Sequence, residues 1–149
     1  MSAAAASRGA VGTCATVVVA DQATKQLAAE ELAGRSPVEL PLGFELDYLT
    51  NTGIAFGLLE EGEGLVIAIT LGALALLLAW FSRDPVRPGL WPGVGLLAGG
   101  ALGNLADRVR DGAVIDFIDP PNWPAFNLAD VAITIGVALL LAAYWRGPD

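Results

Sequence analysis

The sequence predicts an all-α membrane protein with four transmembrane helices and a small extracytoplasmic β-sheet between the first two helices. Hydrophobic residues make up 54% of the chain and charged residues only 16%, against roughly 25% charged residues in soluble proteins. Apolar stretches of the length that spans a bilayer recur along the chain. A chain of 149 residues has room for one domain, so we expect residues 1–149 to form a single integral membrane domain.

The four predicted helices lie at about 9–29, 64–82, 89–108 and 124–145. The uncharged part of the first helix is too short to cross the hydrocarbon core, so Asp21 and Lys25 must lie in its last turns. No polar break precedes Asp21, which favours an uncleaved helix over a cleaved signal peptide. The fourth helix carries a single charge, Asp130.

The orientation of the helices follows from the loop between the second and third of them. Lysine and arginine residues divide equally between the two sides of the membrane. The short loop that carries Arg83 and Arg87 gives the cleaner signal, because several residues on the other side belong to helix ends. We therefore expect both termini to lie in the cytoplasm.

The segment between the first two helices, at about 36–60, is predicted to contain the β-structure. From Val38 to Tyr48 apolar residues alternate with polar or small ones, which is typical of a half-buried strand or hairpin. Pro41 and Gly43 indicate a bend or a sheet edge within it. The alternative is a loop that packs against its own helices.

The composition excludes several kinds of function. The chain has no histidine and one cysteine, which rules out Ser-His-Asp and Cys-His catalysis and histidine-based metal sites. We expect no metal and no cofactor. A net charge of −8 argues against nucleic acid as a partner.

Two carboxylates are the strongest candidates for chemistry. Asp116 and Asp130 are predicted at the same end of neighbouring helices, and ionisable groups at membrane depth usually mark a functional site. Two close carboxylates share a proton, so one can act as general base while the other acts as general acid. The alternative is a solvated pair, or a pair bound to Lys25 and Arg108.

The third helix combines close packing with a polar end. Gly95, Gly99 and Gly103 recur every four residues, which lets a neighbouring helix approach closely. Asp107 is expected to be an ion-paired helix end rather than a catalytic group. Asn104 and Arg108 can donate hydrogen bonds to a substrate carbonyl or to a catalytic carboxylate.

Ordered sequence blocks resemble lipoprotein signal peptidase (signal peptidase II), a family of bacterial membrane aspartyl proteases. The blocks are Asp21–Lys25, Asn51–Gly57, Gly103–Arg108 leading to Val114–Phe117, and Phe126–Asp130. The resemblance runs almost end to end. It implies four transmembrane helices with an outer β-sheet cradle, in the bacterial cytoplasmic (inner) membrane, with the active site at the outer face.

The resemblance also implies roles for individual residues. Asp116 and Asp130 would be the catalytic aspartates. The residues that shape the site or bind substrate would be Asp21, Lys25, Asn51, Gly53, Phe56, Asn104, Arg108 and Asn127. The substrates would be diacylglyceryl-modified prolipoproteins, cut just before the lipidated cysteine. We expect contact with membrane lipid and a monomer.

Two other functions stay open on the residues alone. A proton-coupled transporter would use the aspartates as a relay, but the second helix offers no charge to complete a path. A Ser-Lys protease would pair Lys25, the only lysine, with Ser36 on a loop.

Overall fold

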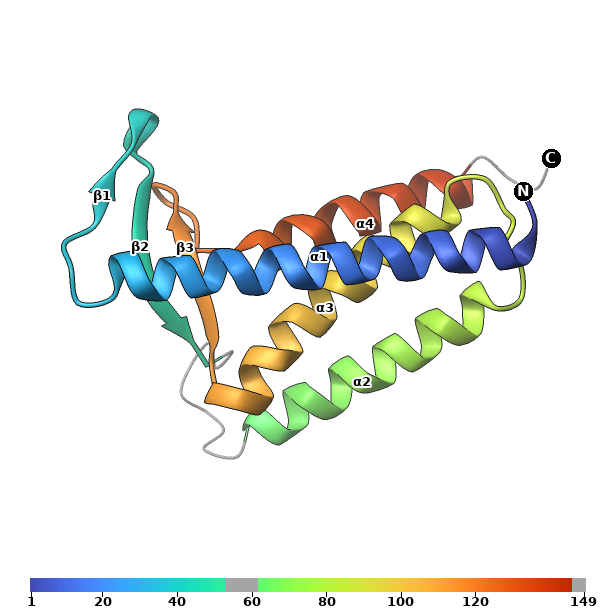
Figure 1. Cartoon of the computed structure of the whole chain (residues 1–149), viewed down its shortest axis with the longest axis horizontal. Coiled ribbons are helices and arrows are strands. Elements are labelled where there is room, and N and C mark those ends of the chain that lie inside the picture. The colour runs from blue at the N-terminus through green and yellow to red at the C-terminus, as the bar shows by residue number, and fades with distance from the viewer. Residues whose placement is uncertain (53–61, 146–149) are drawn as a thin grey trace.

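The structure is a computed structural model that describes residues 1–52 and 62–145. Four helices dominate it, and a small sheet lies at one end of them (Figure 1). In chain order the elements are α1 (Ala3–Leu32), β1 (Val38–Glu39), the 3₁₀ turn Pro41–Gly43, β2 (Glu45–Asn51), α2 (Gly62–Phe81), α3 (Leu90–Asp111), β3 (Val114–Asp119) and α4 (Leu128–Trp145).

Helix α3 packs against both α1 and α4 through its glycines. A Cβ atom on Gly99 would lie 2.7 Å from Val17 Cβ of α1, and one on Gly103 would lie 2.5 Å from Asp21 Oδ2. A Cβ atom on Gly100 would collide with the Ala129 carbonyl oxygen of α4. The close helix approach predicted from the glycine spacing is therefore confirmed.

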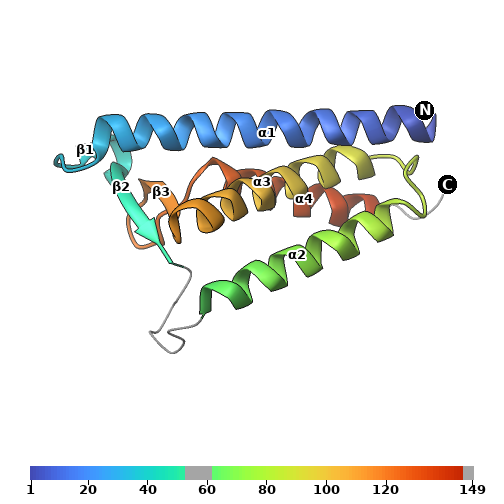
Figure 2. The ribbon, with the colours of Figure 1, turned by 60° about the horizontal axis from the view of Figure 1, so that its bottom comes forward.

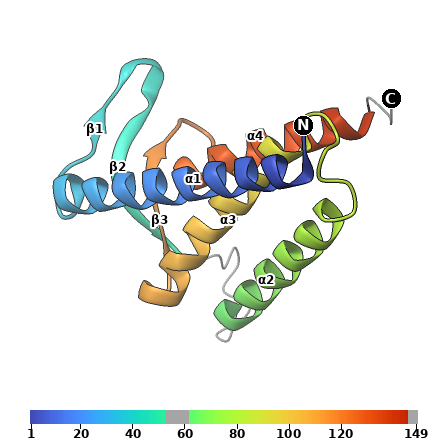
Figure 3. The same cartoon turned by 45° about the vertical axis from the view of Figure 1, so that its right-hand side comes forward.

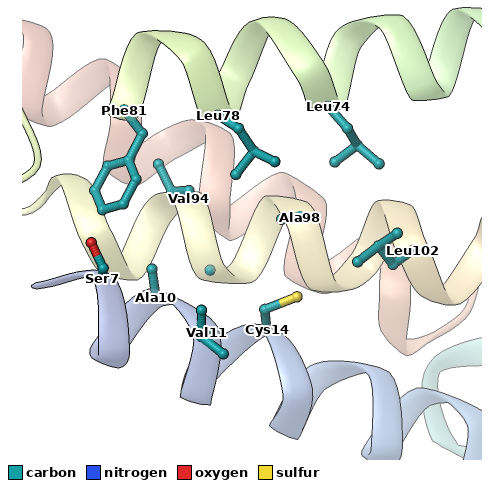
Figure 4. A pocket seen from close by; sticks show the side chains of 11 residues that line it. Ser7, Ala10, Val11, Cys14, Leu74, Leu78, Phe81, Val94, Ala98 and Leu102 are labelled. Carbon is teal, nitrogen blue, oxygen red and sulfur yellow. The ribbon is translucent and has the colours of Figure 1, made fainter. Parts of the chain in front are cut away.

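Helix α2 stands apart from the other three. It packs against α3 near Phe81 and diverges from α1 toward its own N-terminus (Figures 2 and 3). This divergence leaves an apolar crevice of about 380 Å³ between α1, α2 and α3 (Figure 4). Its walls include Cys14, Leu74 and Ala98. It lies away from the carboxylates described below.

The sheet confirms the predicted hairpin and corrects its extent. Strands β1 and β2 are antiparallel and flank the turn predicted at Pro41 and Gly43. The sheet is not confined to the segment between the first two helices, because β3 pairs with β2 in the order β1-β2-β3. Leu49 faces Asp116 in this pairing. The sequence reading missed β3 because its pairing partner lies more than 60 residues earlier in the chain.

The helix boundaries differ from the prediction mainly at α1 and α4. Helix α1 starts earlier, where Ser2 Oγ accepts a hydrogen bond from the Ala5 N–H at 3.2 Å, and it ends later, at Leu32. Helix α4 starts four residues later than expected because Phe126 still pairs with Ile118 of β3. Among the described residues, α1, α2 and α4 are long and apolar enough to cross a membrane, whereas α3 falls short of that measure.

Candidate active site

The sequence predicted Asp116 at the end of a helix. The structure places it on strand β3 instead. Its side chain is 3% exposed. Its Oδ2 atom accepts a hydrogen bond from Asn51 Nδ2 at 3.0 Å, and its Oδ1 atom accepts one from Asn127 Nδ2 at 2.7 Å. The pairing of β3 with β2 brings Asn51 to Asp116, because the two residues lie on adjoining strands.

Asp130 lies in the first turn of α4, where a reciprocal cap holds it. The Asn127 side chain accepts a hydrogen bond from the Asp130 N–H at 3.1 Å, and Asp130 Oδ2 accepts one from the Asn127 N–H at 3.1 Å. This is a capping box, with the two residues at the N-cap and N3 positions. The cap holds Asp130 at the start of α4, with its carboxylate bonded to the Asn127 N–H.

Asn127 connects the two aspartates. It is fully buried, and its side-chain amide reaches Asp116 while its backbone N–H reaches Asp130. The same amide also lies 3.1 Å from Asn104 Oδ1. One residue therefore binds both carboxylates.

Asn104 is oriented by Lys25. The Lys25 ammonium lies 2.8 Å from Asn104 Oδ1. Because an ammonium only donates, the amide oxygen must face it, which leaves Nδ2 to donate to Asp130 Oδ1 at 2.9 Å. The lysine on α1 thus acts on Asp130 through the amide of α3.

A buried ionic cluster ties α1 to α3 beneath the two aspartates. Lys25 Nζ lies 2.8 Å from Asp21 Oδ2 and 2.7 Å from Asp107 Oδ2, and all three side chains are at most 1% exposed. Asp21 Oδ1 in turn accepts the Ala129 N–H of α4 at 2.9 Å. The cluster contains the ion pair expected for Asp107, and it fixes the start of α4.

The surroundings of Asp116 raise the pKa of its carboxyl. Burial raises the pKa of the Asp116 carboxyl, and the neighbouring negative charge of Asp130 raises it further. Hydrogen bonds from Asn51 and Asn127 and the positive charge of Lys25 act in the opposite direction. The net result is a carboxyl that keeps its proton to higher pH than an ordinary aspartic acid.

An apolar pocket opens beside Asp130. It measures about 340 Å³, and of the described residues that line it Asp130 is the one with a charge. The other walls are Trp123, Phe126, Val131, Thr134 and Ile135. A ligand in this pocket would place hydrocarbon against α4 and a polar group against the carboxylate.

Most of the predicted site residues meet at this end of the molecule. Asp21, Lys25, Asn51, Asn104 and Asn127 form one connected network with the two aspartates. Gly53 and Phe56 lie outside the described residues.

Arg108 is the predicted residue that the network does not include. Its Nη1 atom lies 3.4 Å from the Asn104 carbonyl oxygen, a long contact, and its buried Nε atom has no hydrogen-bond partner in residues 1–52 and 62–145. Among the described residues, no ion pair joins Arg108 or Lys25 to Asp116 or Asp130. The salt-bridged alternative for the aspartate pair is therefore wrong for the described part of the chain.

The sequence reading missed Gln22. Its Nε2 atom donates to Asp107 Oδ1 at 2.8 Å, and its Oε1 atom accepts a hydrogen bond from Arg110 at 3.0 Å. Its position could have identified it, because residues three apart, such as Gln22 and Lys25, lie on the same face of a helix. Lys25 directs its three hydrogen bonds to Asp21, Asn104 and Asp107, which leaves none for the Ser36 of the Ser-Lys alternative.

Comparison with known proteins places the chain in a family. The family model described as Signal peptidase (SPase) II matches residues 13–146. The lipoprotein signal peptidase of Pelotomaculum thermopropionicum is 45% identical over 137 residues, which cover 91% of this chain and 90% of that protein. The one from Syntrophotalea carbinolica is 47% identical over 144 residues, covering 89% and 88%.

Solved structures agree with this comparison. A bacterial membrane enzyme determined by the in meso method at 1.9 Å resolution superposes with a TM-score of 0.85 at 32% identity, over 93% of this chain and 94% of that one. A second, at 2.3 Å resolution, gives a TM-score of 0.82 at 33% identity, over 92% and 87%. The chain therefore belongs to the signal peptidase II family.

Proposed function

We propose that this chain is a membrane aspartic endopeptidase that removes the signal peptide of diacylglyceryl-modified prolipoproteins, cutting just before the lipidated cysteine. Membership of the signal peptidase II family supports a protease that processes prolipoproteins at the bacterial inner membrane. The single observation that carries the aspartic mechanism is the pair Asp116 and Asp130, joined through Asn127.

The hydrogen bonds leave the pair ready to hold a water molecule. Each of the four carboxylate oxygens accepts one hydrogen bond from Asn51, Asn104 or Asn127. A carboxylate oxygen has a second lone pair, so each can also contact a water or carry the shared proton. The three asparagines thus hold the carboxylates without neutralising them.

The reaction follows from one ionised and one protonated carboxyl. The ionised group takes a proton from water, and the oxygen of that water attacks the scissile carbonyl carbon while the protonated group donates its proton to the carbonyl oxygen. The tetrahedral intermediate then collapses: one of its hydroxyl groups returns a proton to the carboxylate that had donated one, the C–N bond breaks, and the leaving nitrogen takes a proton from the carboxyl that received one from water. The raised pKa of Asp116 suits it to hold the shared proton.

The placement of the pair suits a lipid-bearing substrate. We propose that all four helices span the membrane, with α3 shielded by α1 and α4, and that both termini lie in the cytoplasm. The aspartates then lie at the outer face. An acyl chain leaves a bilayer at a cost of roughly 0.8 kcal/mol per CH₂, so the scissile bond must be cut at the membrane. The apolar pocket beside Asp130 would take the hydrocarbon next to that bond.

The network described above comes from one chain, which supports an active monomer. Residues of α1, β2, α3, β3 and α4 each contribute to it. We propose that residues 1–149 work as one domain.

The test is cleavage of a diacylglyceryl-modified prolipoprotein in reconstituted vesicles. We expect Asp116→Asn and Asp130→Asn each to abolish the mobility shift of the product on gels, because each leaves the pair one carboxyl short. Asp119→Asn, on the same strand, is the matched control and should retain activity. Normal cleavage by either site variant, in protein that inserts as well as the wild type, would refute the proposal.

A further inference from the structure

Two neighbouring loops of the outer sheet share an unusual backbone feature. In residues 1–52 and 62–145, the non-glycine residues with positive φ are Leu42, at 68°, and Asn122, at 61°. Leu42 lies in the turn between β1 and β2, and Asn122 lies between β3 and α4. Asparagine tolerates this conformation, whereas leucine rarely adopts it because its Cβ atom crowds the backbone.

The two loops meet at their tips. A Cβ atom on Gly43 would lie 3.6 Å from Pro121 Cγ. Both loops line one hollow of about 400 Å³, to which Glu45 and Asp119 also contribute. The tips therefore form one surface although nearly 80 residues separate them in the chain.

Each tip displays a large apolar side chain that the described protein leaves uncovered. Leu42 is 89% exposed, and Trp123 is 71% exposed although it also forms a wall of the pocket beside Asp130. The left-handed backbone at Leu42 adds strain without burying the side chain against the protein. A strained conformation that displays a leucine indicates that something outside the described protein receives it.

The position of these tips relative to the bilayer indicates what contacts the two exposed side chains. Helix α4 has 18 residues, so it is about 27 Å long, close to the roughly 30 Å of the hydrocarbon core. Its first turn then lies at the hydrocarbon boundary, and Trp123, five residues earlier, lies at headgroup level. The β1–β2 hairpin projects sideways past the ends of the helices (Figures 1 and 3). If α4 spans the membrane, lipid surrounds the helices on that side.

We propose that Leu42 and Trp123 insert together into the outer bilayer interface and anchor the sheet there. Tryptophan is enriched at this depth because its ring is apolar with one polar N–H group. The carboxylates of Glu45 and Asp119 beside the tips match a zwitterionic lipid surface rather than an anionic one. The inference uses the membrane span of α4 proposed above and is independent of the catalytic role of the aspartates.

The first test measures the depth of Trp123. A variant that keeps Trp123 alone, with Trp80, Trp91 and Trp145 changed to phenylalanine, is reconstituted in phosphatidylcholine brominated near the carboxyl end of its acyl chains. We expect at least a twofold loss of emission relative to unbrominated lipid, together with protection from aqueous iodide. Full emission in brominated lipid with free iodide access would overturn the proposal. So would quenching that starts only when a prolipoprotein is added, because the tips would then contact substrate.

The second test separates anchoring from backbone strain at Leu42. Leu42→Gly removes both the strain and the apolar side chain, so we expect a higher melting temperature in detergent but weaker bromolipid quenching of Trp123. Leu40→Gly, in the same hairpin at an ordinary φ of −115°, is the matched control and should lower the melting temperature. Leu42→Asp should weaken the quenching further. Unchanged quenching in both Leu42 variants would remove Leu42 from the anchor.

Discussion

Replacing Lys25 with methionine tests whether the buried ionic cluster sustains the fold around the site. Two buried carboxylates, Asp21 and Asp107, share this one ammonium, so the formal charge of the three groups is −1. In Lys25→Met it becomes −2, and the cation still paired with Asp107 is Arg110, which is 56% exposed and lies 3.5 Å away. Breaking a buried ion pair typically costs about 3–5 kcal/mol, a large share of the roughly 5–15 kcal/mol by which a protein is stable.

The assay is thermal unfolding of the purified protein in detergent. For a chain of this size about 1 kcal/mol corresponds to about 2–4 °C, so we expect the melting temperature of Lys25→Met to fall by roughly 6–20 °C. The double variant Lys25→Met/Asp107→Asn returns the formal charge to −1 and should recover a large part of the loss. Arg35→Met breaks the exposed pair with Glu31, whose side chains are 61% and 69% exposed. It should shift the melting temperature by about 2 °C at most, because such helix pairs contribute about 0.3–0.5 kcal/mol.

The reasoning fails if Lys25→Met melts within about 2 °C of Arg35→Met. It also fails if the double variant is less stable than the single one, because the penalty would then not come from uncompensated charge.

Three further variants test the site itself. Asn51→Ala removes a hydrogen bond that lowers the pKa of Asp116, so the limb of the pH–rate profile that Asp116 controls should move to higher pH; a move to lower pH would contradict this. Asn127→Ser keeps a good helix cap but loses the amide, so kcat should collapse while the melting temperature falls less than in Asn127→Ala, where loss of the cap costs about 0.5–2 kcal/mol. Gly100→Ala and Gly136→Ala both overpack the α3–α4 interface, at about 1–3 kcal/mol each. Only Gly100→Ala, which meets the first turn of α4, should also lower kcat, and equal kcat losses would refute this assignment.

Local patterns in the sequence carry much of the helical architecture. Hydrophobic runs predict helices because the bilayer thickness sets how many apolar residues a membrane span needs. This requirement does not depend on which other elements pack against the helix. The alternation from Val38 to Tyr48 predicted the hairpin in the same way, because side chains along a strand alternate between its faces. The glycine spacing predicted close packing of α3, although not which helix each glycine would meet.

Such local patterns could not predict which site residues form hydrogen bonds with each other. The capping box of Asn127 and Asp130 lies within four consecutive residues, so the sequence pattern could have predicted it, whereas the bond between Asn127 and Asp116 needs β3 to turn back toward α4. Asn51 reaches Asp116 only because β2 and β3 pair in one register. The sequence blocks identified these residues as a set, without the hydrogen bonds between them.

By itself the sequence determined the kinds of element and the chemical groups at their ends. These follow from hydrophobic length, residue periodicity and the presence of carboxylates without histidine. The tertiary structure alone decided that Asp116 lies on a strand, that Lys25 sits between Asp21 and Asp107, and that Asn127 joins the two aspartates. The physical reason is range. Propensity and periodicity act over a few residues, whereas the bonds from Lys25 to α3 and from Asp21 to α4 link residues about 80–110 positions apart, which only the packing of the helices brings together.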